Sequence, residues 1–116
     1  MGMRFFKSAR HALNGLSAVL KTEPNFFVQA IIFLIMIGLG LFFRVNQTEW
    51  VVIVFSAVLV LILEIINTSI EKILDLLKPR LDDRVGLIKD MMAGAVLLSA
   101  LAALVIGLLI FIPYMV

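Results

Sequence analysis

The sequence predicts an all-α integral membrane protein, in which an N-terminal amphipathic surface helix precedes three transmembrane helices. Two observations lead to this fold class. Hydrophobic residues make up 63% of the 116-residue chain, well above the share in soluble domains. Three apolar runs separated by short polar segments are each long enough to cross a bilayer as a helix, which takes about 17–25 residues. The length fits one membrane-embedded domain over residues 1–116.

The composition also excludes several kinds of site. The chain has no cysteine, so disulfides, thiolate zinc sites and cysteine nucleophiles are ruled out. The single histidine, His11, leaves no histidine cluster for a metal. The first apolar run begins only after a charged amphipathic segment, so we expect no cleavable signal peptide.

Residues 3–21 are predicted to form the surface helix. Apolar residues recur on one of its faces, and basic residues cluster on the other. The apolar face holds Phe5, Phe6, Ala9, Leu13, Leu16 and Leu20, and the remainder includes Arg4, Lys7, Arg10, His11 and Lys21. Such a helix lies at the membrane surface with its basic groups toward anionic headgroups. A plain anchoring role explains this segment equally well.

The first span is predicted over residues 26–43, which are apolar or glycine except for Gln29. Thr22 is a candidate cap for this helix, and Pro24 suits its first turn. A polar turn over residues 44–49 should follow.

The second span is predicted over residues 50–66, with Trp50 as an interface anchor, and its helix should continue toward Leu77. Pro79 would stop it, and residues 78–90 are predicted to form a polar loop. The third span covers residues 91–112, with Pro113 and Tyr114 closing it.

The distribution of basic residues predicts the orientation. Basic residues concentrate in two segments, which are the N-terminal one (Arg4, Lys7, Arg10, Lys21) and the second loop (Lys78, Arg80, Arg84, Lys89). The first loop has Arg44 alone, and the C-terminus has none. The positive-inside rule therefore places the N-terminus and the second loop in the cytoplasm and the C-terminus outside.

A polar stripe dominates the second span. Glu64, Asn67, Glu71 and Asp75 are spaced three, four and four residues apart, which places them on one helical face with Thr68 beside them. A carboxylate at the centre of a bilayer costs about 2.5–3.5 kcal/mol on insertion scales, so such residues are functional by default. The stripe could bind a divalent cation, a phosphate-bearing ligand held through that cation, or a proton. Alternatively, Glu64 alone could be protonated, or paired with a lysine for assembly.

The third span carries small residues every four positions, at Ala95, Ser99, Ala103 and Gly107. This ridge is typical of a helix-packing face and needs no further function. Three helices leave little room for a sheltered polar site within one subunit, so we expect a homo-oligomer with sites between subunits.

Two motifs resemble the prokaryotic diacylglycerol kinase family, which includes diacylglycerol kinases and undecaprenol kinases. The first is the run Glu64-x-x-Asn67-Thr68-Ser69-Ile70-Glu71-x-x-x-Asp75, and the second is Lys89-Asp90 followed by Ala93-Gly94-Ala95-Val96-Leu97-Leu98. The resemblance covers nearly the whole chain. Details closer to the undecaprenol kinase branch are Thr48-Glu49-Trp50, Asn67-Thr68 and the ending from Gly107 to Pro113.

The resemblance implies a homotrimeric enzyme of the bacterial inner membrane that moves the γ-phosphate of ATP onto a lipid alcohol, undecaprenol or diacylglycerol. Its implied partners are ATP, Mg²⁺, that lipid alcohol and membrane lipids, with no nucleic acid. The sequence contains no Walker A motif and no protein-kinase loop motif, so ATP must be bound differently from soluble kinases.

The resemblance also assigns roles. It makes Glu64 the general base and Asn67 the residue that orients the reacting groups, while Glu23 and Glu71 hold Mg²⁺. The remaining matches are to the nucleotide site. Lys89 and Asp90 would contact the nucleotide, and Asp75 would support the same end of the site. Arg4 would contact phosphates or substrate, and His11 takes the place of an aromatic that stacks on the nucleotide. A bland surface histidine is an equal alternative for His11. The 80–82 segment would approach the adenine.

The chain departs from the family pattern after Glu23. Phe27 and Gln29 stand where relatives often have a charged residue, and Pro24 directly follows the glutamate. A non-enzymatic oligomer that conducts or binds cations or protons would also explain an intramembrane Glu64. It would not explain why Glu23, Glu71 and Lys89-Asp90 should converge at the cytoplasmic interface.

Overall fold

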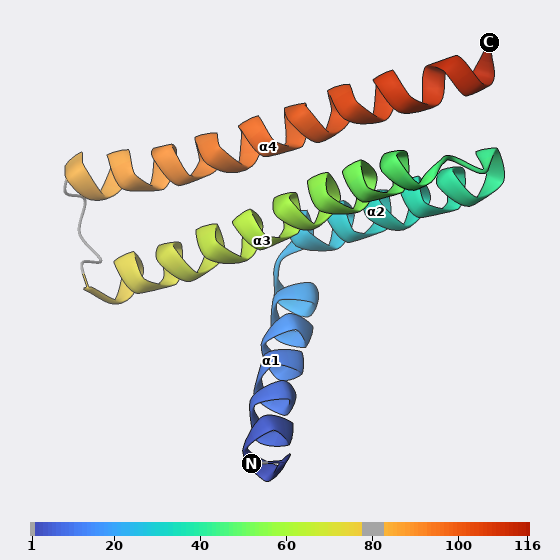
Figure 1. The fold of residues 1–116 in the computed structure, drawn as a ribbon. Helices are drawn as coiled ribbons and strands as arrows, with labels where there is room; N and C mark the ends of the chain where they lie inside the picture. Colours follow the sequence, from blue (N-terminus) through green and yellow to red (C-terminus); the bar gives the residue numbers. More distant parts are fainter. Residues whose placement is uncertain (1, 78–82) are drawn as a thin grey trace.

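The computed structural model describes residues 2–77 and 83–116, which form four helices. These are α1 (Gly2–Thr22), α2 (Pro24–Phe43), α3 (Gln47–Leu77) and α4 (Asp83–Met115). The last three run antiparallel in succession, while α1 leaves the bundle steeply near the start of α2 (Figure 1). In the described residues, α2, α3 and α4 are the helices long and apolar enough to cross a membrane. The predicted class of one N-terminal helix plus three spans is confirmed.

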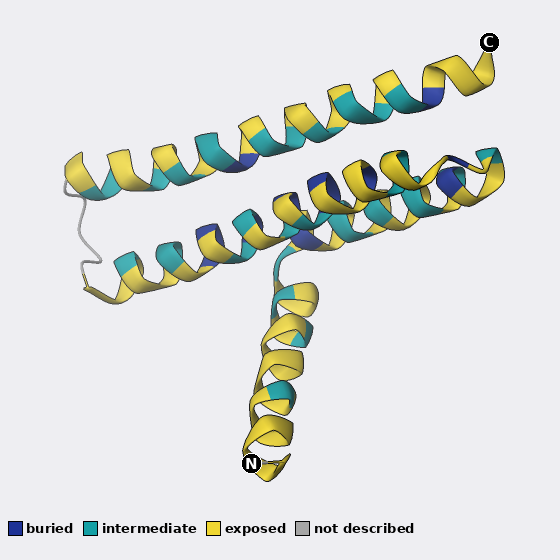
Figure 2. Cartoon of the chain, viewed as in Figure 1, coloured by how far each residue is buried: buried dark blue, intermediate teal, exposed yellow. Residues whose placement is uncertain are grey.

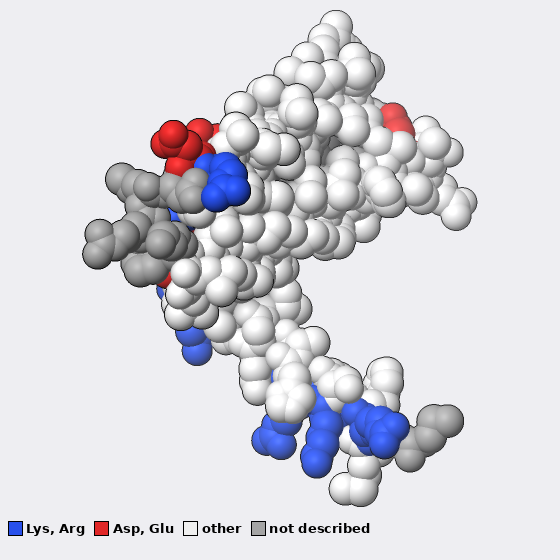
Figure 3. Space-filling model, turned by 90° about the vertical axis from the view of Figure 1, so that its left-hand side faces the viewer, with Lys and Arg blue, Asp and Glu red and all other residues white. Residues whose placement is uncertain are grey.

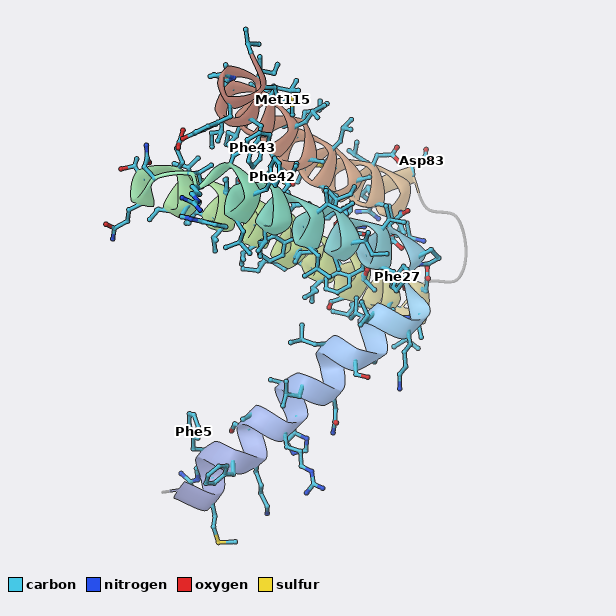
Figure 4. All side chains as sticks on the ribbon, turned by 90° about the vertical axis from the view of Figure 1, so that its right-hand side faces the viewer. Phe5, Phe27, Phe42, Phe43, Asp83 and Met115 are labelled. Atoms are coloured by element: carbon cyan, nitrogen blue, oxygen red, sulfur yellow. The ribbon has the colours of Figure 1, made fainter. Side chains whose placement is uncertain are left out.

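Helix α1 contributes nothing to the core. None of its residues is buried, so the whole helix is coloured exposed or intermediate in Figure 2. Basic side chains gather at the end of α1 that is far from the bundle (Figure 3), and Phe5 also lies far from it (Figure 4). Phe5 and Phe6 remain 71% and 73% exposed, so an apolar face is left without protein contacts. This arrangement is what a helix lying on a membrane surface requires.

Helix α2 begins at Pro24 with Glu23 at its N-cap position. Proline suits the first turn because its missing N–H would have no partner there. The expectation that Thr22 caps this helix is wrong, because the Thr22 hydroxyl donates to the carbonyl of Ala18 within α1 at 2.7 Å. Glu23 makes no side-chain cap hydrogen bond, so its carboxylate is left available to other groups.

The connection between α2 and α3 is tighter than the predicted polar turn over residues 44–49. Arg44 adopts a left-handed conformation (φ 56°, ψ 52°) and ends α2 by donating its backbone N–H to the Gly40 carbonyl. Helix α3 then starts at Gln47, because Asn46 and Glu49 cap it reciprocally. The Asn46 side chain accepts from the Glu49 N–H at 2.8 Å, and Glu49 accepts from the Asn46 N–H at 3.0 Å.

The apolar core lies at this same end of the bundle. Ile53 of α3 is fully buried and packs with Val45 of the connection and Phe111 of α4. Leu39 of α2 packs against this cluster, so all three spans meet there. Trp50 lies directly over Gly40, where an added Cβ would stand 2.7 Å from the indole ring. Phe43 and Met115 mark this end and Asp83 the opposite one (Figure 4). The core therefore fixes the register of the helices far from the polar stripe.

Helix α4 is longer than the predicted third span. It starts at Asp83, so the prediction of a loop as far as residue 90 is wrong for residues 83–90. It also continues to Met115 with Pro113 inside its last turn, where Pro113 was expected to close it. The Tyr114 hydroxyl donates to the Glu49 carboxylate and ties this end of α4 to α3. The predicted stop at Pro79 lies outside the described residues.

Candidate active site

The polar stripe on α3 runs from a buried end to an exposed one. Glu64 is 5% exposed and Asn67 9%, with Thr68 buried beside them. Glu71 is half-buried one turn further on, and Asp75 is exposed. The stripe emerges because α3 and α4 extend past the start of α2, as Figure 1 shows. The helical spacing thus produces a continuous line of polar groups from the interior of the bundle to its charged end.

Three polar or charged side chains lie near the Glu64 carboxylate. One belongs to the stripe, and the other two come from the start of α2 and the residue before it. The Gln29 side chain of α2 lies near enough to the Glu64 carboxylate to interact with it. The carboxylates of Glu71 and Glu23 both lie within electrostatic range of it. The structure therefore brings Glu23, which precedes α2, to the same region as Glu64 and Glu71.

Asn67 links the buried and exposed halves of the stripe. Its amide nitrogen donates to the Glu71 carboxylate at 3.4 Å, a long contact along one face of α3. Its amide oxygen is buried and has no hydrogen-bond partner among residues 2–77 and 83–116. An unpaired buried acceptor costs roughly 1–3 kcal/mol, so such a group usually meets a donor or a cation from outside the chain.

An ion pair joins α3 to α4 at the exposed end of the stripe. The Lys89 ammonium donates to the Asp75 carboxylate at 2.7 Å, with the two side chains 37% and 66% exposed. Asp90 is exposed beside Lys89. Acidic side chains gather at this end, next to a basic one (Figure 3). Because a lysine has three donors, Lys89 retains N–H groups that could contact a phosphate while it stays paired.

Arg4 and His11 are not brought to this region. Both are exposed on α1, which projects away from the bundle (Figures 1 and 4). Their assignment to a nucleotide site remains a prediction. The 80–82 segment lies outside the described residues.

The carboxylates suit a magnesium ion that is shared with a substrate. Within residues 2–77 and 83–116, no group of three acidic or histidine side chains is arranged to hold a metal by itself. Mg²⁺ is commonly bound by one or two carboxylates together with substrate phosphates and waters. Glu23 and Glu71 supply that donor set, and the unpartnered oxygen of Asn67 lies on the same helical face as Glu71. The residues present therefore fit the ion.

An apolar cavity of about 520 Å³ runs between the three spans, away from the stripe. It extends from Gln29 along α2 to Phe111 and Met115 near the end of α4, with Ala57 and Val60 of α3 also lining it. Gln29 therefore lines one end of the apolar cavity and also lies near Glu64, the buried end of the polar stripe.

A family profile described as prokaryotic diacylglycerol kinase matches residues 10–111. The chain belongs to the prokaryotic diacylglycerol kinase family. Among its relatives is the undecaprenol kinase of Bacillus subtilis, 36% identical over 110 residues that cover 95% of this chain and 89% of that protein. The diacylglycerol kinase of Escherichia coli K12 is 28% identical over 102 residues, covering 88% and 84%. That of Synechocystis is 31% identical over 107 residues, covering 91% and 61%.

Membership of the prokaryotic diacylglycerol kinase family confirms the resemblance drawn from the motifs and supports a lipid kinase activity in a membrane. Gln29 was not among the candidate site residues, because the sequence marks it only as an interruption of the first span and as a departure from the family pattern. The structure places it near Glu64. A polar residue inside a span is itself a signal of function, and that signal could have identified Gln29.

Proposed function

We propose that this chain is an ATP- and Mg²⁺-dependent lipid kinase that transfers the γ-phosphate of ATP to a lipid alcohol. The observation that carries the proposal is the polar stripe on α3, which occurs here in a member of a lipid kinase family. A buried Glu64 stands at one end, and a charged Asp75–Lys89 pair at the other. An acceptor hydroxyl with an apolar tail belongs at the first end, and a charged nucleotide belongs at the second.

Glu64 is proposed as the general base. It takes the proton of the lipid hydroxyl as the alcohol oxygen forms its bond to the γ-phosphorus. The bond from that phosphorus to the bridging oxygen breaks, and ADP leaves with the electron pair. Asn67 orients Glu71 through its N–H and keeps its carbonyl oxygen for the reacting groups. Phosphoryl transfer needs chiefly positioning and neutralisation of charge, which these groups can supply.

Glu23 and Glu71 are proposed to hold Mg²⁺. These two carboxylates would hold the ion, which would supply positive charge to neutralise the phosphates. The half-buried position of both carboxylates suits this role, because they are accessible from the charged end and still lie close enough to Glu64 to interact with it. Placing two anionic groups there is costly without a cation.

Lys89 and Asp90 are proposed to contact the nucleotide, with Asp75 holding Lys89 in place. Arg4 and His11 could join them only if α1 folds against a membrane or another subunit. We propose a homotrimer, in which a neighbouring subunit covers part of the exposed stripe. We also propose that the N-terminus and the active site face the cytoplasm and that the C-terminus lies outside the bacterial inner membrane.

Undecaprenol is proposed as the preferred acceptor over diacylglycerol. The supporting observations are the undecaprenol kinase relative, which is 36% identical, and the sequence details shared with that branch. Purified protein in detergent should be given γ-labelled ATP and Mg²⁺, with the two lipids offered in parallel. Label in both products with the faster rate for undecaprenol is expected. A faster rate for diacylglycerol would reverse the preference, and no transfer to either lipid by folded protein would refute the kinase.

A separate experiment discriminates the kinase from an oligomer that only binds or conducts cations. Mg²⁺-dependent protection of the protein by ATP against proteolysis is expected, and it should be lost in Glu71→Gln. Unchanged protection in this variant would count against the assignment of the metal site.

A further inference from the structure

We propose that Gln29 is a positioning residue for the general base, holding the Glu64 carboxylate in its reactive orientation from the neighbouring helix. This inference rests on the proposed function, since it takes Glu64 to be the base. It goes beyond that function because Gln29 stands where the family pattern departs, so no role is carried over to it from the resemblance.

The contact between these two side chains joins two helices. Gln29 lies on α2 and Glu64 on α3, and the tight Arg44 connection sets them at the same height. Gln29 is 15 residues before Arg44, and Glu64 is 17 residues into the helix that starts at Gln47. At about 1.5 Å per residue, these separations place both side chains roughly 22–26 Å from the connection. The Gln29 side chain lies near enough to the Glu64 carboxylate to interact with it through its amide.

The orientation of the Gln29 amide follows from its partner. An ionised carboxylate only accepts hydrogen bonds, so the NH₂ group of the amide must face Glu64. The Oε1 atom then points elsewhere, and it is buried without a hydrogen-bond partner in the described part of the chain. Turning the amide over would set an oxygen against the carboxylate. The unsatisfied Oε1 is therefore the cost of keeping the donor directed at Glu64.

The surroundings of Gln29 make a purely structural role a poor explanation. Every other residue that lines the adjoining cavity is apolar, including Ile32 and Phe33 on the same helix. An apolar side chain of similar size would fill this position without leaving a buried oxygen unpaired. A glutamate side chain has three torsions, and a base must stay within hydrogen-bond reach of the proton that it removes. A donor on a separate helix restricts those torsions.

The first test compares Gln29→Met with Leu34→Met in purified protein. Methionine keeps the length of the glutamine and removes its donor, and Leu34 is a matched control because it is 66% exposed on the same helix. In Gln29→Met, kcat for transfer to lipid is expected to fall by about tenfold or more, since a general base contributes about 10²–10⁴-fold. KM for ATP should change less than about twofold, because the nucleotide end is untouched. Leu34→Met should match the wild type.

A kcat for Gln29→Met within twofold of the wild type would overturn the inference, as would a loss that appears mainly in KM for ATP. Gln29→Leu serves as a second variant if the methionine variant folds poorly. Its side chain has no hydrogen-bond donor, so the same loss of kcat is expected.

The second test does not depend on kinase activity. Thermal unfolding midpoints of Gln29→Met, Glu64→Met and the double variant form a double-mutant cycle, because methionine at either position removes the interaction between the two side chains. If Gln29 acts on Glu64, the midpoint shift of the double variant differs from the sum of the single shifts. Additive shifts overturn the contact. If the wild type transfers phosphate to neither lipid while the cycle shows coupling, the proposed function fails and the contact stands.

Discussion

Glu64→Gln should lower activity and raise stability at the same time. The substitution keeps the shape of a side chain that is only 5% exposed and removes its negative charge. Gln29 can still pair with the new amide, because a glutamine oxygen also accepts a hydrogen bond. Activity falls and stability rises because the buried carboxylate is needed for the reaction but destabilises the folded state.

The size of each effect follows from the surroundings of Glu64. Without a base, the rate of transfer should fall by about 10²–10⁴-fold. Neutralising the side chain removes the cost of burying a charge and the repulsion from Glu71 and Glu23. Even paired buried charges can often be replaced by well-packed apolar residues with a gain of up to about 4 kcal/mol. For this unpaired charge we expect the free energy of unfolding to rise by about 1–3 kcal/mol.

Two measurements on the same preparation check this. Initial rates of label transfer from ATP to lipid give the activity, and unfolding in detergent gives the stability. Binding of Mg²⁺–ATP should remain within about twofold of the wild type, whereas Glu71→Gln should weaken it. Retention of more than a tenth of the activity would show that another group or the substrate itself accounts for the proton. A lower stability would refute the view that the buried charge is costly.

Three further predictions concern the ends of the bundle and the metal. Lys89→Met should weaken nucleotide binding about 10–100-fold by isothermal titration, with a stability change below about 1 kcal/mol because the pair is exposed; equal binding would remove Lys89 from the site. Gly40→Val should lower the free energy of unfolding by about 1–3 kcal/mol relative to Gly38→Val. A Cβ at position 40 would stand 2.7 Å from the Trp50 ring, whereas a Cβ at position 38 would have no neighbour within 4 Å. Equal effects of the two substitutions would contradict this packing. Chelating Mg²⁺ should stop transfer without moving the thermal midpoint, because substrate phosphates complete the coordination; a large midpoint shift would indicate a structural metal.

Much of the fold follows from local pattern. The apolar runs predict three spans, and the alternation of basic and apolar residues predicts α1. The loop predicted as far as residue 90 is helical from Asp83, because polar residues at the end of a span lower its hydropathy without breaking a helix. The sequence did contain the signal for the earlier start of α3. Asn46 and Glu49 have the spacing of a capping box.

The candidate site was predictable only in part. The spacing of Glu64, Asn67, Glu71 and Asp75 determines one helical face, so the stripe needed no tertiary information. The Asp75–Lys89 pair and the Gln29–Glu64 contact depend on the register between helices. That register is set at the opposite end of the bundle by the left-handed Arg44 and the packing around Ile53, which periodicity does not encode.

The most direct measurement of the central claim is the fate of the γ-phosphate in a single turnover. Purified wild-type protein and the Glu64→Gln variant, both shown to bind Mg²⁺–ATP, are mixed with γ-labelled ATP and undecaprenol, and the label is followed in lipid and in water. Label that enters the lipid in the wild type and stays on ATP in the variant is the predicted result. Label that enters only inorganic phosphate, or that reaches the lipid equally fast in both proteins, would contradict the account.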